Sequence, residues 1–447
     1  MNVSNKNTAL EGLKGAVCAV IDRHREAIID LGEKVWAHPE SGFREYETAR
    51  RIAGLFKDLG LPCQEGLALT GVRTELNGTQ PGPTLALLGE MDAIILPEHP
   101  AADPVTGAVH ACGHNAQLAG LFGAALALNQ PGILDQLAGR IVFMAVPAEE
   151  YLELDFRRQL VRDNKIQFLG GKQELIRLGH FRDVNLALMI HTCAGQIAQI
   201  RHSMNGFTAQ YANFTGRAAH AGAFPHMGVN ALNAAMLALQ SINAQRETFP
   251  EGQHVRVHSI ITKGGNSVNT VPADVQVETM VRARTVETIN AAAVKARRCY
   301  QAGTLAVGGK VVIESFPGYL PLNDCPSMAE LFKRNVTGFV GNANIRNDEH
   351  LASSTDMGDV TQIMPASHPS LGGAEGGAHS TAFRIVDPEL AYVVPAKVLA
   401  MCAIDLLSNQ AVVAQKIIKQ HPPLIAPDSY PALMQQQYGK ETHDYLR

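Results

Sequence analysis

The sequence predicts an α/β protein with a largely parallel sheet in one domain and a ferredoxin-like domain inserted into it. Three observations support this fold. Apolar runs of strand length alternate with helical patterns up to residue 203. From residue 204 the order becomes strand, helix, strand, strand, helix, strand. The length of 447 residues also exceeds what one core of ordinary size holds, which favours two domains.

The larger domain is predicted over residues 1–203 and 317–447. A helical pattern runs over residues 10–59, is interrupted near His38-Pro39, and resumes as a second helix from residue 45. Three runs are apolar on consecutive residues, as expected of strands covered on both faces: residues 84–88, 141–146 and 185–190. An Ala- and Leu-rich stretch between the first two predicts a buried helix over residues 117–128.

The inserted domain is predicted over residues 204–316. Its elements follow in order: strand 206–215, helix 230–245, strands 255–262 and 274–282, helix 286–302, and strand 310–315. Beyond residue 317 the helix and strand patterns return and end in an apolar helix over residues 390–407. The tail after Gln420 is polar and rich in proline, and no element is predicted there.

Composition excludes several classes of partner. The net charge is -4, with 18% charged residues and no block of like charges, so neither nucleic acid nor a membrane surface is an expected partner. No secretory signal and no uninterrupted apolar run of about 18 residues is apparent. Seven scattered cysteines do not suggest a disulfide framework. We therefore expect a cytoplasmic protein with reduced thiols.

One short segment collects residues that bind metals. Cys112 and His114 flank a glycine just before the predicted helix, whose N-terminus would lower the pKa of the thiol. A thiolate and an imidazole two residues apart are good ligands for a divalent ion. The alternative is a buried structural cysteine beside an ordinary histidine. The triplet alone does not decide between the two.

Two adjacent carboxylates follow a buried strand. Glu149 and Glu150 end the apolar run over residues 143–148, at the strand end where α/β sheets carry their sites. One carboxylate could bind a metal while the other acts as a general base. A solvated acidic turn is the alternative, and delivery from the core disfavours it. His191 closes another buried strand, whereas the local sequence around His379 does not distinguish it from a surface histidine.

At these motifs the chain resembles the metal-dependent amidohydrolases that include hippurate hydrolase, indole-acetyl-amino-acid hydrolases, aminoacylase and carboxypeptidase G. The resemblance covers nearly the whole chain. Eight motifs occur in the same order as in that family, and such a series is highly specific. They are His-Pro-Glu at 38–40, Gly-Glu-Met-Asp-Ala at 89–93, the segment 110–115, Pro-Ala-Glu-Glu at 147–150, His191, Gly-Arg-Ala-Ala-His-Ala at 216–221, Asn-Thr-Val-Pro at 269–272, and Ser-Thr-Asp at 354–356.

The resemblance implies a zinc-peptidase-like catalytic domain with one or two divalent ions, of zinc, manganese or cobalt. Five residues match the ligands of a two-metal site, with Cys112 as the bridge: Cys112, His114, Glu150, His191 and His379. Glu149 matches the general base that deprotonates the attacking water and protonates the leaving amine. Asp92 matches an outer residue that orients a ligand.

The resemblance also implies that the inserted domain is a lid and a dimerisation domain. His220 matches a histidine that reaches across a homodimer to stabilise the tetrahedral oxyanion. Asn269 and Arg282 match polar lid residues that hold a substrate carboxylate, for which Arg282 suits bidentate contact. The expected substrate is therefore a small amide that carries a carboxylate.

The chain departs from the hippurate hydrolase pattern at Asn115, where those relatives carry aspartate beside the ligand histidine. This asparagine and the residues of the 89–92 and 354–360 motifs are closer to those of the aminobenzoyl-glutamate hydrolase branch. That favours N-acyl or N-aroyl amino acids or dipeptide-like amides. Loss of a carboxylate beside the ligands makes the site less negative, which puts the second metal in question.

Residues 151–172, polar and basic, resemble an insertion directly after the candidate base. A solvated helix is the favoured interpretation of this segment, and a wall of the pocket is the alternative. Two alternatives to amide hydrolysis also stay open. The same scaffold could deaminate an aromatic amine hydrolytically, or the protein could be a non-catalytic binder. The complete set of candidate ligands and base disfavours the binder.

Overall fold

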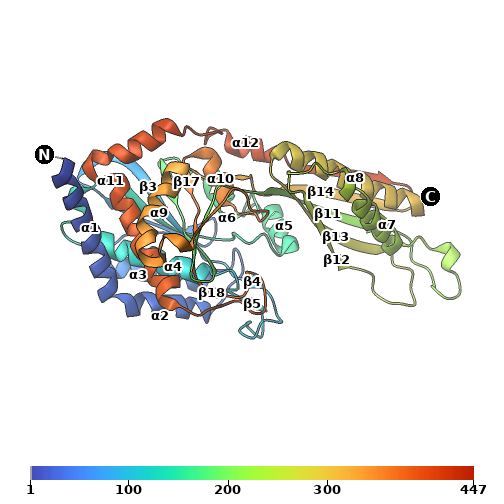
Figure 1. Ribbon diagram of the computed structural model, residues 1–447. Helices are drawn as coiled ribbons and strands as arrows, with labels where there is room; N and C mark the ends of the chain where they lie inside the picture. The colour runs from blue at the N-terminus through green and yellow to red at the C-terminus, as the bar shows by residue number, and fades with distance from the viewer. Residues whose placement is uncertain (1–2, 447) are drawn as a thin grey trace. The chain divides into compact units, whose positions relative to one another are not determined.

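The computed structural model describes residues 3–446, with side chains described from Thr8 onward. The chain forms two compact units (Figure 1). The first contains the chain up to His202 together with Asn323–Glu349 and Asp359–Asp428. The second contains Ser203–Leu322, His350–Gly358 and residues from Ser429 to the C-terminus.

The first unit is built on a six-stranded sheet with the order β1-β2-β6-β3-β7-β17. Its members are β1 (Gln64–Leu67), β2 (Gly71–Asn77), β3 (Gln80–Glu90), β6 (Ala138–Val146), β7 (Leu186–Leu188) and β17 (Ala366–Ser367). The pairs among β6, β3, β7 and β17 are parallel, and β1 and β2 add an antiparallel edge. The predicted α/β class with a largely parallel core is confirmed.

Helices cover this sheet because its central strands are apolar on both faces. The helices are α1 (Val3–Arg23), α2 (Arg25–Trp36), α3 (Tyr46–Asp58), α4 (His114–Leu128) and α11 (Val394–Gln420). Leu85 and Leu87 of β3 lie in one continuous core with side chains of these five helices. Every residue of α4 is buried, as its sequence predicts. A Cβ on Gly123 would collide with Ala396 and Ile28, so α4 packs closely against α11 and α2.

A second, smaller sheet in the first unit is not predicted by the sequence. It has the order β16-β9-β18-β19, with β8 paired to β18. Its strands are β8 (His191–Ala194), β9 (Ala198–Arg201), β16 (Ile345–Asp348), β18 (Ser370–Glu375) and β19 (Arg384–Ile385). They are two to six residues long, and partners from distant parts of the chain define them. This sheet holds His191 at the start of β8.

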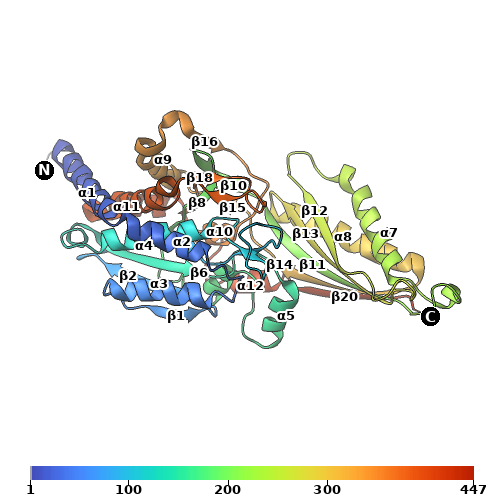
Figure 2. The same cartoon turned by 90° about the horizontal axis from the view of Figure 1, so that it is seen from below.

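The second unit has a five-stranded antiparallel sheet with the order β12-β13-β11-β14-β20. The elements are β11 (Gly206–Thr215), α7 (Ala231–Ala244), β12 (Arg256–Lys263), β13 (Asp274–Ala283), α8 (Val286–Val307), β14 (Lys310–Pro317) and β20 (Gly439–Asp444). Figures 1 and 2 show α7 and α8 side by side on one face of the sheet, where they enclose their own core. The first six elements in chain order, β-α-β-β-α-β, match the ferredoxin-like arrangement that the sequence predicts.

Two segments that the sequence pattern assigns to the larger domain lie in the second unit. The C-terminal tail forms β20, which pairs with β14 from Lys310 to Ser315. Residues 350–358 also lie there, and Asn205 contacts this segment through hydrogen bonds with His350 and Ala352. Long-range pairing brings these segments to the second unit, and local sequence carries little signal for it.

Helix α11 continues a short π-helical turn, η5 (Glu389–Val393). The combined stretch Glu389–Gln420 is long and apolar enough to cross a membrane, but its most apolar part is entirely buried within the protein. The helix also kinks at Ser408, where four residues leave the helical conformation. It therefore serves as a core helix of the first unit.

Candidate metal centre

Strand ends of the parallel sheet bring acidic and histidine side chains together. β3 ends at Glu90, two residues before Asp92, and β6 ends three residues before Glu149. β7 is followed by β8, which begins at His191. Because the strands are parallel, these residues meet at one edge of the sheet, as the sequence predicts. His114 joins them as the first residue of α4.

Three groups of three side chains have donor atoms close enough to share a metal ion, and two of these groups contain Cys112. One comprises Cys112, His114 and His191, and the other Cys112, Glu150 and His379, with donor atoms within 4.8 Å of one another in each group. Cys112 belongs to both groups. The Sγ atom of Cys112 lies 3.6 Å from His191 Nε2, and His379 Nε2 lies 2.8 Å from Glu150 Oε1.

Two histidines are held so that Nε2 faces the centre. Nδ1 of His114 lies 2.8 Å from the carbonyl oxygen of Asp92 and 3.2 Å from Asp92 Oδ1. Nδ1 of His191 lies 2.7 Å from the carbonyl oxygen of Thr192. In a neutral ring, donation of Nδ1–H to these oxygens leaves the lone pair on Nε2, which is the usual arrangement of a ligating histidine.

The carboxylate of Asp92 connects two candidate ligands. One oxygen approaches His114 Nδ1, and Oδ2 accepts the backbone N–H of Glu150 at 2.8 Å. Asp92 is fully buried. Asp92 therefore contacts both the His114 ring and the backbone of the Glu150 turn, and its role as an orienting residue stays a prediction.

The electrostatics of the centre favour bound cations. The carboxylate of Glu150 raises the pKa of His379 to about 11, against the effect of burial. Burial lowers the pKa of His114, but Glu90 and Cys112 outweigh burial and hold it well above its ordinary value. Both rings therefore take up protons as counter-charges. A divalent ion would displace those protons, because metal ligation needs neutral imidazole.

The thiol of Cys112 is prepared for ligation by the same charges. Burial and Glu150 raise its pKa, but His191 and His114 outweigh them and lower it to about 6. Burial likewise raises the pKa of Glu150, whereas His379 and His114 lower it to about 2. At neutral pH the centre therefore presents a thiolate and a carboxylate.

Buried donor atoms without hydrogen bonds show that the residues fit a metal ion. His114 Nε2 and Glu150 Oε1 are both buried and make no hydrogen bond within the described residues. Each does have a charged neighbour, Glu90 Oε2 at 3.2 Å and His379 Nε2 at 2.8 Å respectively. These two contacts are attractions between opposite charges, and they lack the geometry of a hydrogen bond. Buried polar atoms rarely stay unsatisfied, and sulfur, imidazole and carboxylate are the donor set of a zinc-like ion.

Sequence reasoning missed three residues behind the centre. Glu90 is fully buried and lies in a third potential donor group with His114 and Glu149. Lys172 Nζ lies 2.6 Å from Glu90 Oε1, and Gln117 Nε2 donates to Glu90 Oε2 at 2.6 Å. Glu90 ends a buried strand like the glutamates of the other motif, which is the signal that could have found it. No local signal marks Lys172.

The structure does not bring the side chain of Asn115 to the donor atoms. Its Nδ2 donates to the carbonyl oxygen of Gly32 at 3.1 Å and to Tyr392 Oη at 3.2 Å. Asn115 is fully buried, so its amide links α4 to α2 and to the turn before α11. The nearby carboxylate Glu90 supplies negative charge in the same region.

The predicted lid residues lie in the second unit, at two different ends of its sheet. His220 and Asn269 are exposed and belong to adjoining loops, where Ala221 N–H donates to the Asn269 carbonyl oxygen at 3.0 Å. Arg282 lies near the far end of β13, beside Phe207 and His258. The eight residue-to-residue steps from Asp274 to Arg282 span about 26 Å at about 3.3 Å per step. Asn269 and Arg282 of one chain therefore cannot hold the same carboxylate.

The basic segment after Glu150 is not simply a solvated helix, and that favoured interpretation is wrong for its inner face. The segment forms α5 (Leu154–Arg162) and the start of α6 (Gly171–Arg177). Arg157 and Lys172 are both buried, as is Phe168. Charge in the local sequence suggested solvent, but partners elsewhere in the fold bury these side chains.

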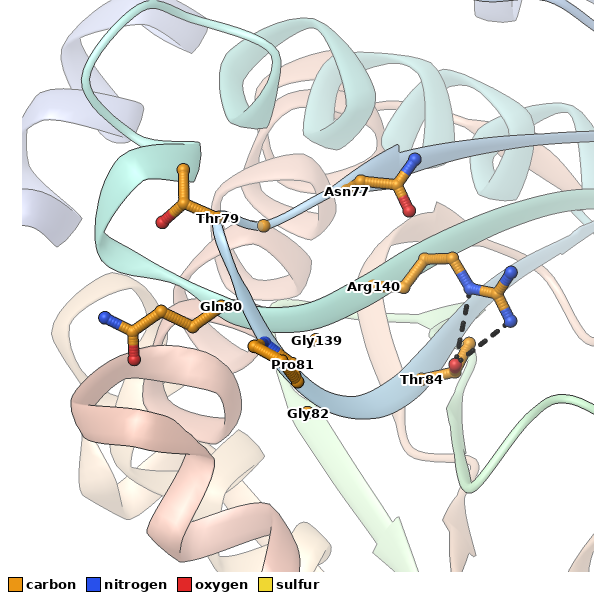
Figure 3. Close-up of a pocket in the computed structure, with 9 residues that line it drawn as sticks. Asn77, Thr79, Gln80, Pro81, Gly82, Thr84, Gly139 and Arg140 are labelled. Carbon is orange, nitrogen blue, oxygen red and sulfur yellow. Dashed lines mark hydrogen bonds between the residues drawn. The ribbon is translucent and has the colours of Figure 1, made fainter.

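A separate hollow of about 460 Å³ lies at the opposite ends of β3 and β6. Figure 3 shows it between the strand starts around Gln80 and Gly139, with Arg140 along one side. Arg140 pairs with Asp183 at 2.6 Å and with Glu75 at 3.3 Å. The positive charge of Arg140 is therefore balanced by these two carboxylates. The hollow lies at the starts of β3 and β6, whereas the candidate metal centre lies at their ends.

Comparisons with known proteins agree with this geometry. Residues 204–298 match the family model described as "Peptidase dimerisation domain". The chain is 28% identical to the Xaa-Arg dipeptidase of Mus musculus over 434 residues, which cover 90% of each protein. It is 30% identical to one of the subunits of the p-aminobenzoyl-glutamate hydrolase of Escherichia coli over 272 residues, or 59% of this chain and 52% of that protein.

Solved structures share the fold. A Bacillus subtilis protein described as a dinuclear metal-binding peptidase of the M20 family superposes with a TM-score of 0.63 at 20% identity. The match covers 88% of this chain and all of that protein. Residues 204–298 thus match the dimerisation domain of M20 peptidases, and the chain is similar to peptidases and amidohydrolases along most of its length.

Proposed function

We propose that the protein hydrolyses the amide bond of a small N-acyl or N-aroyl amino acid or a dipeptide-like amide. The observation that carries this proposal is the pair of donor groups that share Cys112 beside the second carboxylate, Glu149. Two cations within reach of one amide, with a separate base, form the arrangement that metal-assisted hydrolysis requires.

One or two ions of zinc, manganese or cobalt complete the proposed site. Cys112, His114 and His191 would hold one ion, and Cys112, Glu150 and His379 the other. Such ions polarise a carbonyl group and make a neighbouring water more acidic. The thiolate character of Cys112 supports a bridging position, because one negative sulfur can balance charge on both sides.

Glu149 is the proposed general base. It is buried, and its carboxylate is within 4.8 Å of the donor atoms of His114 and Glu90. In the reaction it would take a proton from the attacking water and pass that proton to the leaving amine nitrogen. Its neighbour Glu150 is already engaged by His379 and is the less suitable proton carrier.

The second unit is proposed to act as a lid and to form a homodimer. Nδ1 of His220 accepts backbone N–H groups of Gly222 and Ala223, which leaves Nε2 as the nitrogen that can donate to an oxyanion. Because Asn269 adjoins His220 while Arg282 lies at the far end of the sheet, we propose that different protomers supply them to one site. Arg282 would then bind the substrate carboxylate.

The substrate class rests on the similar proteins and on the charges of the chain. The Escherichia coli relative is named for p-aminobenzoyl-glutamate, and the mouse relative for Xaa-Arg dipeptides. Both are amides that carry a free carboxylate. A cytoplasmic location stays a prediction from the sequence, as does the absence of nucleic-acid and membrane partners.

A substrate panel tests the proposed reaction. Purified protein, treated with chelator and then reloaded with zinc, manganese or cobalt, is assayed on N-benzoyl and N-aminobenzoyl amino acids, dipeptides and an aryl amine. We expect metal-dependent release of an amino acid from at least one amide. Ammonia from the aryl amine alone would favour the hydrolytic deaminase, and no turnover of any amide would contradict the proposal.

A further inference from the structure

The turn that carries the two glutamates is strained. Ala148, directly before Glu149, has a φ of 52°, which a residue with a Cβ adopts at some cost. Phe43, which packs nearby, has a φ of 63°. Strain of this kind persists only where surrounding contacts impose it. The contacts around residues 147–150 therefore determine where both glutamates point.

Three of these contacts come from Glu45, directly before α3, from Asp92, after β3, and from Gly171 of α6. The carboxylate of Glu45 accepts the N–H of Ala148 at 2.8 Å, and Asp92 accepts the N–H of Glu150 at 2.8 Å. Gly171 N–H donates to the Ala148 carbonyl oxygen at 3.0 Å. A Cβ on Gly171 would collide with the carbonyl group of Pro147, so this approach requires glycine.

The fourth contact comes from the inserted segment. Arg157 of α5 is 1% exposed and donates from Nη2 to the carbonyl oxygen of Glu150 and from Nη1 to that of Leu169, the latter at 2.5 Å. Its guanidinium carbon lies 5.3 Å from the ring centre of Phe43 and 5.9 Å from that of Tyr151. Within residues 3–446, both hydrogen bonds of this buried cation therefore end on carbonyl oxygens.

Contacts at its N-terminal end hold in place helix α5, which carries Arg157. Arg44 forms an ion pair with Glu153 at 2.6 Å and lies 3.8 Å from the ring centre of Phe156. A Cβ on Gly42 would collide with the guanidinium group of Arg157 and with the backbone of Ala148. The loop 42–44, the helix α5 and the strained turn thus pack as one block.

We propose that Arg157 is a positioning residue that holds the Glu149–Glu150 turn in its strained conformation, and that this is the task of the inserted segment. Two carbonyl groups, that of Glu150 directly before the insertion and that of Leu169 near its end, are joined through one rigid guanidinium fork. The fork ties Glu150 O to Leu169 O, so it closes the insertion at its base and fixes the Glu150 backbone. Arg157 acts through these carbonyl groups and touches neither metal nor substrate. The inference rests on the proposed function, because the roles of Glu149 and Glu150 come from that proposal.

The test compares Arg157→Lys and Arg157→Met with Arg162→Met in the full-length protein. Arg162 lies on the same helix, is exposed and bonds to Gln159, so its loss removes the same charge without touching the turn. Metal affinity is measured by chelator competition, backbone exchange of residues 147–153 by hydrogen–deuterium exchange, and kcat and KM on the best amide substrate. Thermal unfolding reports stability separately.

We expect both Arg157 variants to bind metal about 10- to 100-fold more weakly, as for other residues that orient ligands. Exchange in residues 147–153 should accelerate, kcat should fall while KM changes little, and Arg162→Met should match the wild type. Lysine keeps the charge but cannot bridge two carbonyl groups, so it should not restore affinity. In a further variant, Arg157→Ala, which leaves space for a guanidinium ion, added guanidinium should partly restore kcat.

Folded Arg157→Lys with wild-type metal affinity, turn exchange and kcat would overturn the inference, even if its melting temperature fell. If Arg157→Met does not fold, Arg157→Lys alone decides. Failure of the proposed function looks different: the wild type would then bind no metal or hydrolyse no amide. A wild type that does both, with unaltered variants, contradicts only the role of Arg157.

Discussion

The two adjacent glutamates have different surroundings, and the proposed division of their roles rests on this difference. Glu150 contacts His379 through Oε1, and its backbone is fixed by Asp92. Glu149 instead belongs to the donor group of His114 and Glu90. A carboxylate that binds a metal is a poor proton carrier, and we therefore propose Glu149, which is not in the two Cys112 groups, as the base.

Replacement of the base should separate turnover from metal binding. We expect Glu149→Gln to lower kcat by about 10²- to 10⁴-fold, because an amide cannot accept the proton from water. Its metal content should equal that of the wild type. The matched change Glu150→Gln should instead reduce metal content. A fully active, metal-loaded Glu149→Gln protein would show that another group is the base.

A second residue-scale prediction concerns Asp324, whose buried carboxyl group has no hydrogen bond at Oδ2 within the described chain. Burial raises its pKa from 3.8 to about 7, although the N–H of His368 opposes this shift. Between pH 3.8 and about pH 7, Asp324 therefore keeps its proton in the folded protein, whereas the unfolded chain has released it. Its contribution to stability is fully present below pH 4 and is lost as pH rises through 7.

Asp324→Asn removes this titration. Relative to the wild type, the variant should gain stability as pH rises from 4 to 8, by at most a few kcal/mol. Denaturant unfolding of chelator-treated protein at several pH values measures the difference. A difference that stays constant with pH would mean that Asp324 is not the titrating group.

At the scale of residues, local sequence could mark some of the candidate ligands, but neither His379 nor the residues behind the centre. Cys112, His114 and the two glutamates stand in recognisable motifs at strand and helix ends. Lys172 and Arg157 are charged residues in a polar stretch, a pattern that usually indicates solvent. Their burial follows from partners 82 residues away for Lys172 and 7 and 12 residues away for Arg157.

At the scale of elements, prediction succeeded where a strand or helix has its own signature. β11 is predicted with its observed bounds, and α4 with its buried character. The small strands β8, β9, β16 and β18 were missed because four to six residues carry little periodicity. Pairing with distant strands creates them.

The strand β20 shows the same limit most clearly, and it leads to a prediction. Its sequence Gly-Lys-Glu-Thr-His-Asp has no apolar alternation, yet it covers the edge of β14 with six paired residues. Ending the chain after Tyr438 should uncover that edge, lower the melting temperature and promote self-association.

A chain that ends after Tyr445 keeps the strand and serves as the control. Light scattering and thermal unfolding of both truncated proteins measure the effect. The ion pairs of β20, such as Lys310 with Asp444, are exposed and contribute little, so backbone pairing should account for the change. If the two truncated proteins have equal melting temperatures and equal light scattering, pairing with β20 does not protect the edge of β14.

At the scale of the whole molecule, the division into two units followed from the sequence, but the course of the chain between them did not. The order of elements from residue 206 to 317 revealed the ferredoxin-like fold. The return of residues 350–358 and of the C-terminal tail to the second unit depends on contacts that no local pattern encodes.

The proposed sharing of His220 between protomers predicts complementation. Glu149→Gln and His220→Ala should each be nearly inactive alone. When the two variants are mixed under conditions that exchange subunits, each mixed dimer has one site with both residues intact. Activity should then recover to about a quarter of the wild-type value, because half of the dimers in a symmetric exchange are mixed. A mixture no more active than its components would contradict the shared site.

The most direct test of the central claim is the number of metal ions per chain, measured by elemental analysis in the sample whose amide hydrolysis is assayed. We predict up to two ions per wild-type chain, loss of hydrolysis with their removal, recovery on reloading, and a lower metal content in Cys112→Ser. Amide hydrolysis that persists in fully metal-free protein, or a Cys112→Ser protein with unchanged metal content and activity, would contradict a centre built around Cys112.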